Sequence, residues 1–173
     1  MGMTRKFVVT VAATALAGAA GVGVAQASTT SHASAATGVK VSSCRPANHT
    51  AKITPDASSA GHRHYRVTLT AAPGTESCKL AGSPSGVHFY NHGSLKGVSA
   101  KAYGTQSHAV TLSPGHPVHF DIQVPSSTKG ASADEVAFTL RTPGGGTIPG
   151  ESFADGKLSV DAGTQIGALQ AGA

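Results

Sequence analysis

The sequence predicts an all-β fold, an immunoglobulin-like antiparallel β-sandwich of about seven to nine strands with one disulfide. Apolar residues recur with period two from residue 39 onward, which is the pattern of strands with one buried and one solvated face. Glycine and proline punctuate these segments at short intervals, as they do in hairpin turns. Beyond the N-terminal apolar run, no window of a dozen residues shows the 3.6-residue period of an amphipathic helix.

Three segments carry the clearest alternation, namely 65–71, 118–124 and 136–140. In the last of them we expect Val136 and Phe138 to face the core and Ala137 to face water. Weaker strands are expected at 39–43, 50–54, 87–90, 99–103, 108–112 and 157–160. Pro73-Gly74 and Asp155-Gly156 are among the predicted turns. The chain has no tryptophan, so it lacks the buried tryptophan of antibody domains.

The N-terminus has the pattern of a secretory signal. Arg5 and Lys6 precede an apolar stretch, residues 7–24, and Ala25-Gln26-Ala27 fits the small-x-small cleavage rule. We therefore expect a cleaved signal at 1–27 and a disordered Ser/Ala/Thr-rich segment at 28–37. One β-sandwich domain is then expected at 38–161, followed by a flexible tail at 162–173.

The charge of the chain is a mild positive excess. The formal net charge of +5 includes Arg5 and Lys6; 13 Lys and Arg less these two leaves 11, against 8 Asp and Glu, for +3. The basic residues are scattered and no row of aromatics lies between them, which excludes the electrostatic footprint of nucleic-acid binding. No second apolar run follows the signal, so we expect a secreted monomer with no membrane attachment once the signal is removed.

The only two cysteines are Cys44 and Cys78. Because an exported chain meets an oxidising environment, we expect them to form a disulfide. In the chain-entropy treatment, a bridge that closes the loop 44–78 contributes roughly 4 kcal/mol. That contribution is comparable with the net stability of a small domain, so we interpret the pair as a structural staple.

A set of short motifs resembles those of small secreted actinobacterial proteins that carry an uncharacterised domain. The pattern is an early cysteine, a Cys-x-Leu-x-Gly-x-Pro stretch, and a Leu-x-Pro-Gly turn before an apolar strand. In this chain these elements are Cys44, Cys78-Lys79-Leu80-Ala81-Gly82-Ser83-Pro84, and Leu112-Ser113-Pro114-Gly115 before the strand at 118–124. The resemblance spans 39–160 and implies an immunoglobulin-like sandwich with this disulfide, without implying any activity.

Nine histidines are the unusual feature of the composition. Residues two apart in a strand share a face, so His62 and His64 project together, while His88 and His119 are expected on the solvated faces of their strands. Imidazole nitrogens suit Zn, Cu or Ni, which makes these four residues candidate ligands of a transition-metal site. The favoured interpretation is that exposed strand positions hold polar residues, because a site needs three or four convergent ligands.

Catalytic motifs are absent from the sequence. Gly82-Ser83-Pro84-Ser85-Gly86 puts proline where a nucleophile elbow needs serine, and an oxidised Cys78 cannot serve as a nucleophile. Paired carboxylates for glycoside hydrolysis could come from Asp121, Asp134, Glu135 or Glu151, but acids are few and Asp134-Glu135 reads as a solvated turn. We therefore expect no enzymatic activity and no cofactor.

The expected function is a secreted, non-catalytic β-sandwich module of the bacterial cell exterior. Its partner would be an unknown extracellular protein, a peptide or a wall polymer, held by loops or a sheet edge. An extracellular transition-metal-binding protein that uses the strand histidines is the alternative. A hydrolytic enzyme is the second alternative, and it would require a pocket in which titratable groups converge.

Overall fold

The computed structural model describes residues 41–126 and 130–173. The predicted signal at 1–27 and the predicted disordered segment at 28–37 lie outside the described residues. Secondary structure in the described ranges is β, apart from a three-residue 3₁₀ helix, η1 (Pro46–Asn48). Within those same ranges, no helix is long and apolar enough to cross a membrane.

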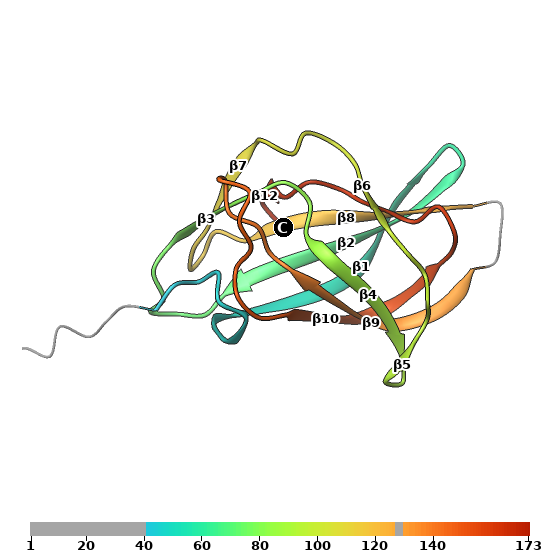
Figure 1. The fold of residues 1–173 in the computed structure, drawn as a ribbon, viewed down its shortest axis with the longest axis horizontal. Coiled ribbons are helices and arrows are strands. Elements are labelled where there is room, and N and C mark those ends of the chain that lie inside the picture. The colour runs from blue at the N-terminus through green and yellow to red at the C-terminus, as the bar shows by residue number, and fades with distance from the viewer. Residues whose placement is uncertain (1–40, 127–129) are drawn as a thin grey trace, which may run out of the picture. The chain divides into compact units, whose positions relative to one another are not determined.

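The strands form one large sheet and one small one (Figure 1). The strands are β1 (His49–Ser59), β2 (His62–Ala71), β3 (Cys78–Ala81), β4 (Ser85–Asn91), β5 (Ser94–Leu95), β6 (Lys101–Ala102), β7 (Ala109–Leu112), β8 (Val118–Pro125), β9 (Ala131–Thr139), β10 (Ser152–Val160), β11 (Gln165–Ile166) and β12 (Gln170–Ala171). The described part of the large sheet has the order β5-β4-β9-β10-β1-β2-β8-β11-β6, with β12 also paired to β8, and β3 pairs with β7. Pairing is antiparallel except between β1 and β10 and between β6 and β11.

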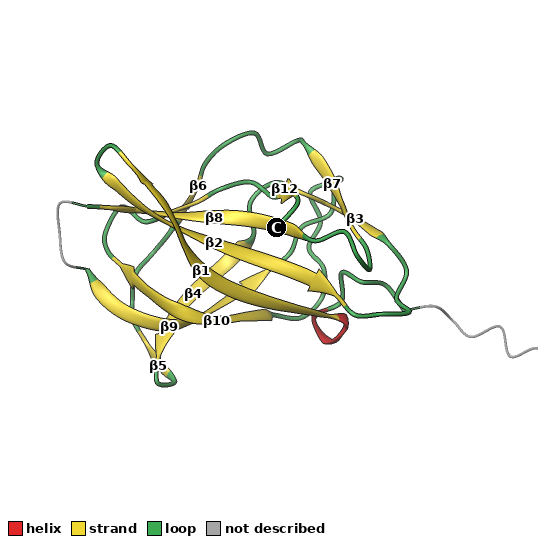
Figure 2. Cartoon of the chain, turned by 180° about the vertical axis from the view of Figure 1, so that it is seen from behind, coloured by secondary structure: helices red, strands yellow, loops and turns green. Residues whose placement is uncertain are grey.

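The large sheet folds over on itself to make the two layers of a sandwich. Phe120 of β8 and Phe138 of β9 pack edge to face with ring centroids 5.1 Å apart, although β10, β1 and β2 separate their strands in the sheet order. One layer therefore contains β1, β2 and β8, and the other contains β4, β9 and β10. Figure 2 shows the first layer from its outer side. The all-β sandwich expected from the sequence is confirmed.

The predicted alternation places the core correctly in most strands. Residues 118, 120, 122 and 124 of β8 are buried, as are Val67 and Leu69 of β2, and their polar neighbours face out. The prediction for Ala137 is wrong, because this residue is 0% exposed. It is paired with Phe153 on one side and His88 on the other, and those larger outward-facing side chains cover it.

Residues 155–156 do not form the turn that the sequence predicts. Asp155 and Gly156 lie inside β10, at an irregularity in its register with β9. Gly156 has φ +152°, and a Cβ added there would lie 2.4 Å from the carbonyl oxygen of Ile53 on β1. Glycine is therefore required here because the β1 and β10 backbones approach each other closely. A glycine within a strand often marks such an approach.

The expected flexible tail at 162–173 is also wrong. This stretch contains β11 and β12, both paired to β8, and it buries Ile166 and Leu169 at 1% exposure each. Without these segments, β8 would expose an unpaired edge, which native sheets tend to cover. Two-residue strands are too short to produce a visible alternation, so the sequence pattern could not predict them. The predicted strand 39–43 is reduced, in its described part, to a bridge between Ser42 and Glu76.

Candidate functional site

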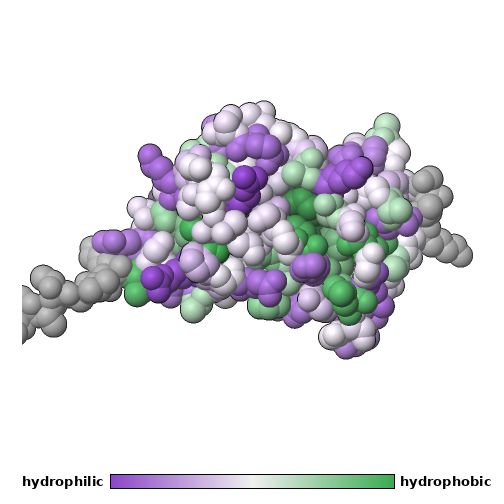
Figure 3. Space-filling view, viewed as in Figure 1, coloured by the Kyte–Doolittle hydropathy of each residue, from purple (hydrophilic) through white to green (hydrophobic). Residues whose placement is uncertain are grey.

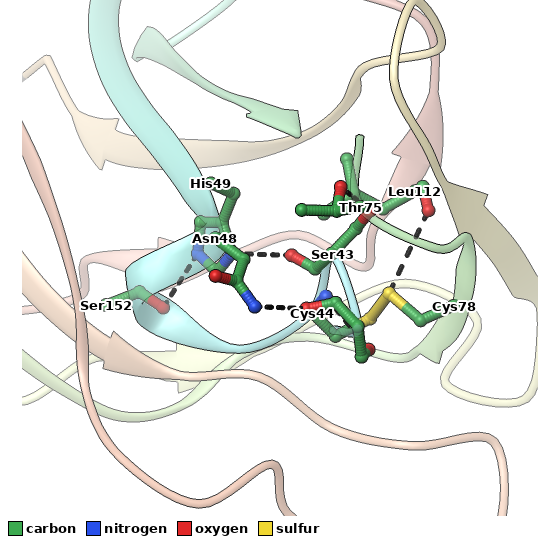
Figure 4. Close-up of a disulfide and its surroundings, with 9 residues drawn as sticks. Ser43, Cys44, Asn48, His49, Thr75, Cys78, Leu112 and Ser152 are labelled. Atoms are coloured by element: carbon green, nitrogen blue, oxygen red, sulfur yellow. Dashed lines mark hydrogen bonds between the residues drawn. A yellow bond between two sulfur atoms is a disulfide. The ribbon is translucent and has the colours of Figure 1, made fainter. Parts of the chain in front are cut away.

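The disulfide joins Cys44 to Cys78 with the Cα atoms 5.9 Å apart (Figure 4). Cys44 is 1% exposed and precedes η1, while Cys78 begins β3. The bridge thus ties the chain that leads into β1 to the small β3–β7 sheet. Asn48 Nδ2 donates to the Ser42 carbonyl oxygen at 2.8 Å, which also fixes the segment that contains Cys44. The predicted disulfide between Cys44 and Cys78 is confirmed.

His49 connects that stapled segment to the large sheet, a role that the sequence did not reveal. Its Nδ1 lies 3.0 Å from the Ser43 carbonyl oxygen and its Nε2 lies 2.9 Å from Ser152 Oγ (Figure 4). Because a carbonyl oxygen only accepts, Nδ1 carries the hydrogen and Nε2 accepts from the Ser152 hydroxyl. Burial is the main influence on the ring, and it lowers the pKa of His49 below its ordinary value.

The four candidate metal ligands do not converge. His62 and His64 share a face of β2 with ring centroids 6.5 Å apart, as expected. His119 of β8 is paired with Thr68, further along β2, and its Nδ1 lies 3.1 Å from the Gly172 carbonyl oxygen. His88 lies on β4 in the other layer. In the described part of the chain, no group of three or more His, Cys, Asp or Glu side chains is arranged to hold a metal ion. The four candidates therefore do not form one cluster, because strand order separates His88 from the others and His119 lies further along the β2–β8 register than His62 and His64.

Two of the four candidates, His64 and His119, line a polar groove of about 260 Å³ on the outer face of β2 and β8, together with other titratable side chains. The residues lining this polar groove are Asp56, Ala57, His64, Arg66, Tyr103, His119, Asp121 and Gln170. The register explains the cluster. Arg66 is paired with Asp121 across β2 and β8, and His64 is paired with Asp56 across β1 and β2, so strand alternation points these side chains outward together.

A chain of hydrogen bonds runs along the edge of the polar groove. Ser59 Oγ lies 2.8 Å from His64 Nε2, and His64 Nδ1 lies 2.8 Å from Asp121 Oδ2. A carboxylate oxygen accepts, so Nδ1 carries the hydrogen, and in the neutral form of the ring Nε2 accepts from the Ser59 hydroxyl. Sequence reasoning missed this cluster, since Ser59 and Asp121 belong to no local motif.

Tyr103 is a second hydrogen-bond partner of Asp121. Its hydroxyl donates to the same Oδ2 atom that accepts from His64. Burial, followed by this hydrogen bond, raises the pKa of Tyr103 far above its ordinary value, so the phenol stays a donor. Gly167 leaves room for the contact, because a Cβ there would lie 3.2 Å from the Tyr103 hydroxyl oxygen.

Arg66 and Asp56 form the charged end of the polar groove. Arg66 Nε donates to Asp56 Oδ2 at 2.9 Å, and its Nη2 lies 2.7 Å from the same oxygen. The pKa of Asp56 is lowered by the backbone N–H of Ala57 first and by Arg66 second. Arg66 Nη1 also donates to the Ala173 carbonyl oxygen at 2.6 Å. All three guanidinium nitrogens of Arg66 thus contact oxygen atoms within the protein.

A second and larger hollow, which we call the end groove, has a volume of about 440 Å³. It is lined by Tyr65, Asn91, His92, Ser132, Ala133, Asp134, Lys157, Leu158 and Ser159. These residues come from both layers of the sandwich, from β2 on one side and from β9, β10 and the β4–β5 turn on the other. Ala133, Leu158 and Tyr65 supply apolar surface, and the remaining residues supply hydroxyl, amide and charged groups.

The β4–β5 turn is held over the end groove by Asp134. The backbone N–H of His92 donates to both carboxylate oxygens, at 3.0 and 3.1 Å, and His92 Nδ1 lies 3.3 Å from Oδ2. His92 has φ +49° and is followed by Gly93 at φ +74°, as a two-residue hairpin turn of type I′ requires. The His92 side chain is 88% exposed, so it is available to a ligand.

Exposed apolar surface gives no rival site in the described ranges. The large hydrophobic residues exposed there are Val41, Leu95 and Phe153, which belong to different elements. Figure 3 shows an apolar strip across the middle of one face, with hydrophilic residues on either side of it. Surface of this mixed kind is ordinary for a folded domain.

Comparisons with known proteins point to one family. A family model described as a domain of unknown function, DUF4232, matches residues 44–168. Comparisons with curated proteins and with solved structures gave no significant match. The matched region begins at Cys44 and extends past β11, so it includes the disulfide, the strands of both layers and nearly all residues of the two grooves. Because the match covers well over half of the chain, this protein belongs to the DUF4232 family of domains of unknown function.

Proposed function

We propose that this protein is a secreted binding module of the cell exterior and that the end groove holds a glycan segment of a wall polymer. The observation that carries the proposal is the composition of the end groove, which places apolar surface beside hydroxyl, amide and charged groups in one hollow of about 440 Å³. Binding sites are mostly concave and combine apolar walls with a few polar groups that fix orientation.

A sugar ring presents the complementary surfaces. Its C–H face packs on aromatic or aliphatic side chains, here Tyr65 and Leu158, and its hydroxyls need both donors and acceptors. Asn91 offers an amide that donates and accepts, and Lys157 offers three donors. Asp134 retains lone pairs beyond those that accept from His92.

The end groove is proposed for binding and not for catalysis. Among its lining residues, His92 and Asp134 are paired with one another, and this pairing fixes the β4–β5 turn. The disulfide supports an extracellular setting, since such bridges persist in oxidising compartments. A rigid scaffold that presents loops at one end is a common architecture for binding proteins.

The test is binding of the purified, oxidised protein to soluble wall-derived glycan fragments and to stem peptides of the same wall, measured by calorimetry. We expect the glycan to bind and the double variant Asn91→Ala/Lys157→Ala to weaken it at least tenfold. Lys79→Ala/Lys101→Ala is the matched control, because both lysines are exposed and lie outside the end groove. Binding of the peptide alone, or glycan binding that survives the groove variant, would overturn the proposal.

A further inference from the structure

The chain Ser59–His64–Asp121 has the order and the hydrogen-bond geometry of a catalytic triad, and this observation is independent of the end groove. The two distances that join its members are both 2.8 Å. Triads are recognised by geometry and roles and not by sequence position, because the same arrangement recurs in unrelated folds and in different chain orders. The absence of a nucleophile motif from this sequence is therefore no argument against one.

The hydrogen bonds of this chain have the arrangement that nucleophilic catalysis needs. Asp121 Oδ2 accepts from His64 Nδ1, which leaves the lone pair of Nε2 directed at the Ser59 hydroxyl. Tyr103 donates to the same carboxylate oxygen and helps to hold Asp121 in place. His64 and Asp121 are each 18% exposed at the side chain, so the base and its partner are partly shielded while Ser59 is exposed.

We propose that Ser59 is an activated nucleophile that hydrolyses esters of small acyl groups. His64 is the general base, and Asp121 is a positioning residue. The acyl group is expected to be small, because the neighbouring polar groove has only about 260 Å³ and is lined mainly by polar side chains. Ser59 is exposed on the β1–β2 hairpin, so the alcohol part of the ester can be large and remain in solvent.

The reaction balances without any cofactor. Ser59 Oγ attacks the ester carbonyl carbon, and its proton passes to His64 Nε2. The bond between the carbonyl carbon and the alcohol oxygen then breaks, and His64 returns the proton to the departing alcohol. Water attacks the acyl-Ser59 ester with His64 again as base, which releases the acid and restores the serine. Asp121 keeps the imidazole in the required tautomer throughout.

The first experiment measures hydrolysis of p-nitrophenyl acetate by the purified, oxidised protein. Ser59→Ala and His64→Gln should each lower the protein-dependent rate at least tenfold, because each removes a member of the reacting pair. Ser58→Ala is the matched control, because it deletes the preceding hydroxyl on the same strand, and its rate should stay within twofold of the wild type.

The second experiment separates catalysis by Ser59 from background attack by exposed imidazoles. A fluorophosphonate probe should label the protein once, and peptide mapping should place the adduct on Ser59. Asp121→Asn should slow the labelling while leaving the unfolding midpoint within a few degrees of the wild type, since it disturbs the tautomer more than the fold. Labelling elsewhere, no labelling, or an unchanged ester rate in Ser59→Ala would overturn the proposal. Because Ser59 is exposed, we expect Ser59→Ala to fold, so a lower rate in this variant would not come from unfolding.

Discussion

Phe120 and Phe138 pack edge to face across the sandwich, with their ring planes at 74° and both side chains fully buried. Phe120 comes from β8 and Phe138 from β9, so the pair joins the two layers at the centre of the fold. Aromatic pairs in this geometry contribute about 0.5–1.5 kcal/mol beyond the burial of their area. The contact therefore holds together the two halves of a sheet that are far apart in strand order.

Truncating this contact should strongly destabilise the protein. We expect Phe138→Ala to lower the free energy of unfolding by about 3–5 kcal/mol, because it removes a buried ring and leaves a cavity. Phe153→Ala is the control, as this ring is 51% exposed, and its effect should stay near 0.5 kcal/mol. Urea denaturation followed by circular dichroism measures both. Equal losses in the two variants would contradict the described core.

The strands that sequence analysis predicted well are those whose burial depends on local pattern alone. Each of the four apolar positions of β8 is buried, because a central strand with one inner face shows its alternation directly in the sequence. Ala137 breaks the rule because its outward side is covered by Phe153 and His88 of the two neighbouring strands. Burial of that kind depends on strand order, which a sequence pattern does not contain.

The candidate sites were hidden for the same reason. His64 was identified as a residue of interest, but its partner Asp121 is 57 positions away and meets it only through the β2–β8 register. His49 was not among the candidate site residues, yet it is buried and hydrogen-bonded to Ser43 and Ser152. Composition drew attention to the histidines without indicating their partners. The roles of the histidines required the tertiary fold.

Gly156→Ala should disrupt the contact between β1 and β10. The added Cβ would lie 2.4 Å from the Ile53 carbonyl oxygen, and neither backbone can move without loss of the parallel pairing beside it. We expect the free energy of unfolding to fall by at least about 2 kcal/mol, the range of overpacking combined with backbone strain. Thermal and urea unfolding measure the change.

Gly115→Ala provides the comparison for this substitution. Gly115 has φ +79° and nothing lies within 4 Å of a Cβ at that position, so only the conformational cost of about 1 kcal/mol applies. A smaller loss for Gly156→Ala than for Gly115→Ala would show that the β1–β10 contact is looser than described.

Removing the disulfide should lower stability without abolishing the sandwich. The bridge spans a sequence separation of 34 residues, for which loop-closure entropy predicts a contribution of roughly 4 kcal/mol. We expect Cys44→Ala/Cys78→Ala to show this loss in urea denaturation, and we expect reduction of the wild type to reproduce it. A reductant should have no effect on the double variant. Equal stability of the oxidised and reduced wild type would contradict a stabilising bridge.

His49 should make the stability of the protein depend on pH. Burial lowers the pKa of His49 in the folded state below the unfolded value of about 6.5. At pH values between these two pKa values, the unfolded chain therefore binds more protons than the folded chain. The contribution of neutral His49 to the free energy of unfolding is therefore complete above pH 6.5 and is lost as the pH falls toward the folded-state pKa.

We expect His49→Gln to flatten this part of the profile in urea denaturation measured from pH 8 to pH 5. His108→Gln, which changes an exposed histidine, should keep the wild-type slope. A His49→Gln profile as steep as that of the wild type would assign the pH dependence to other groups.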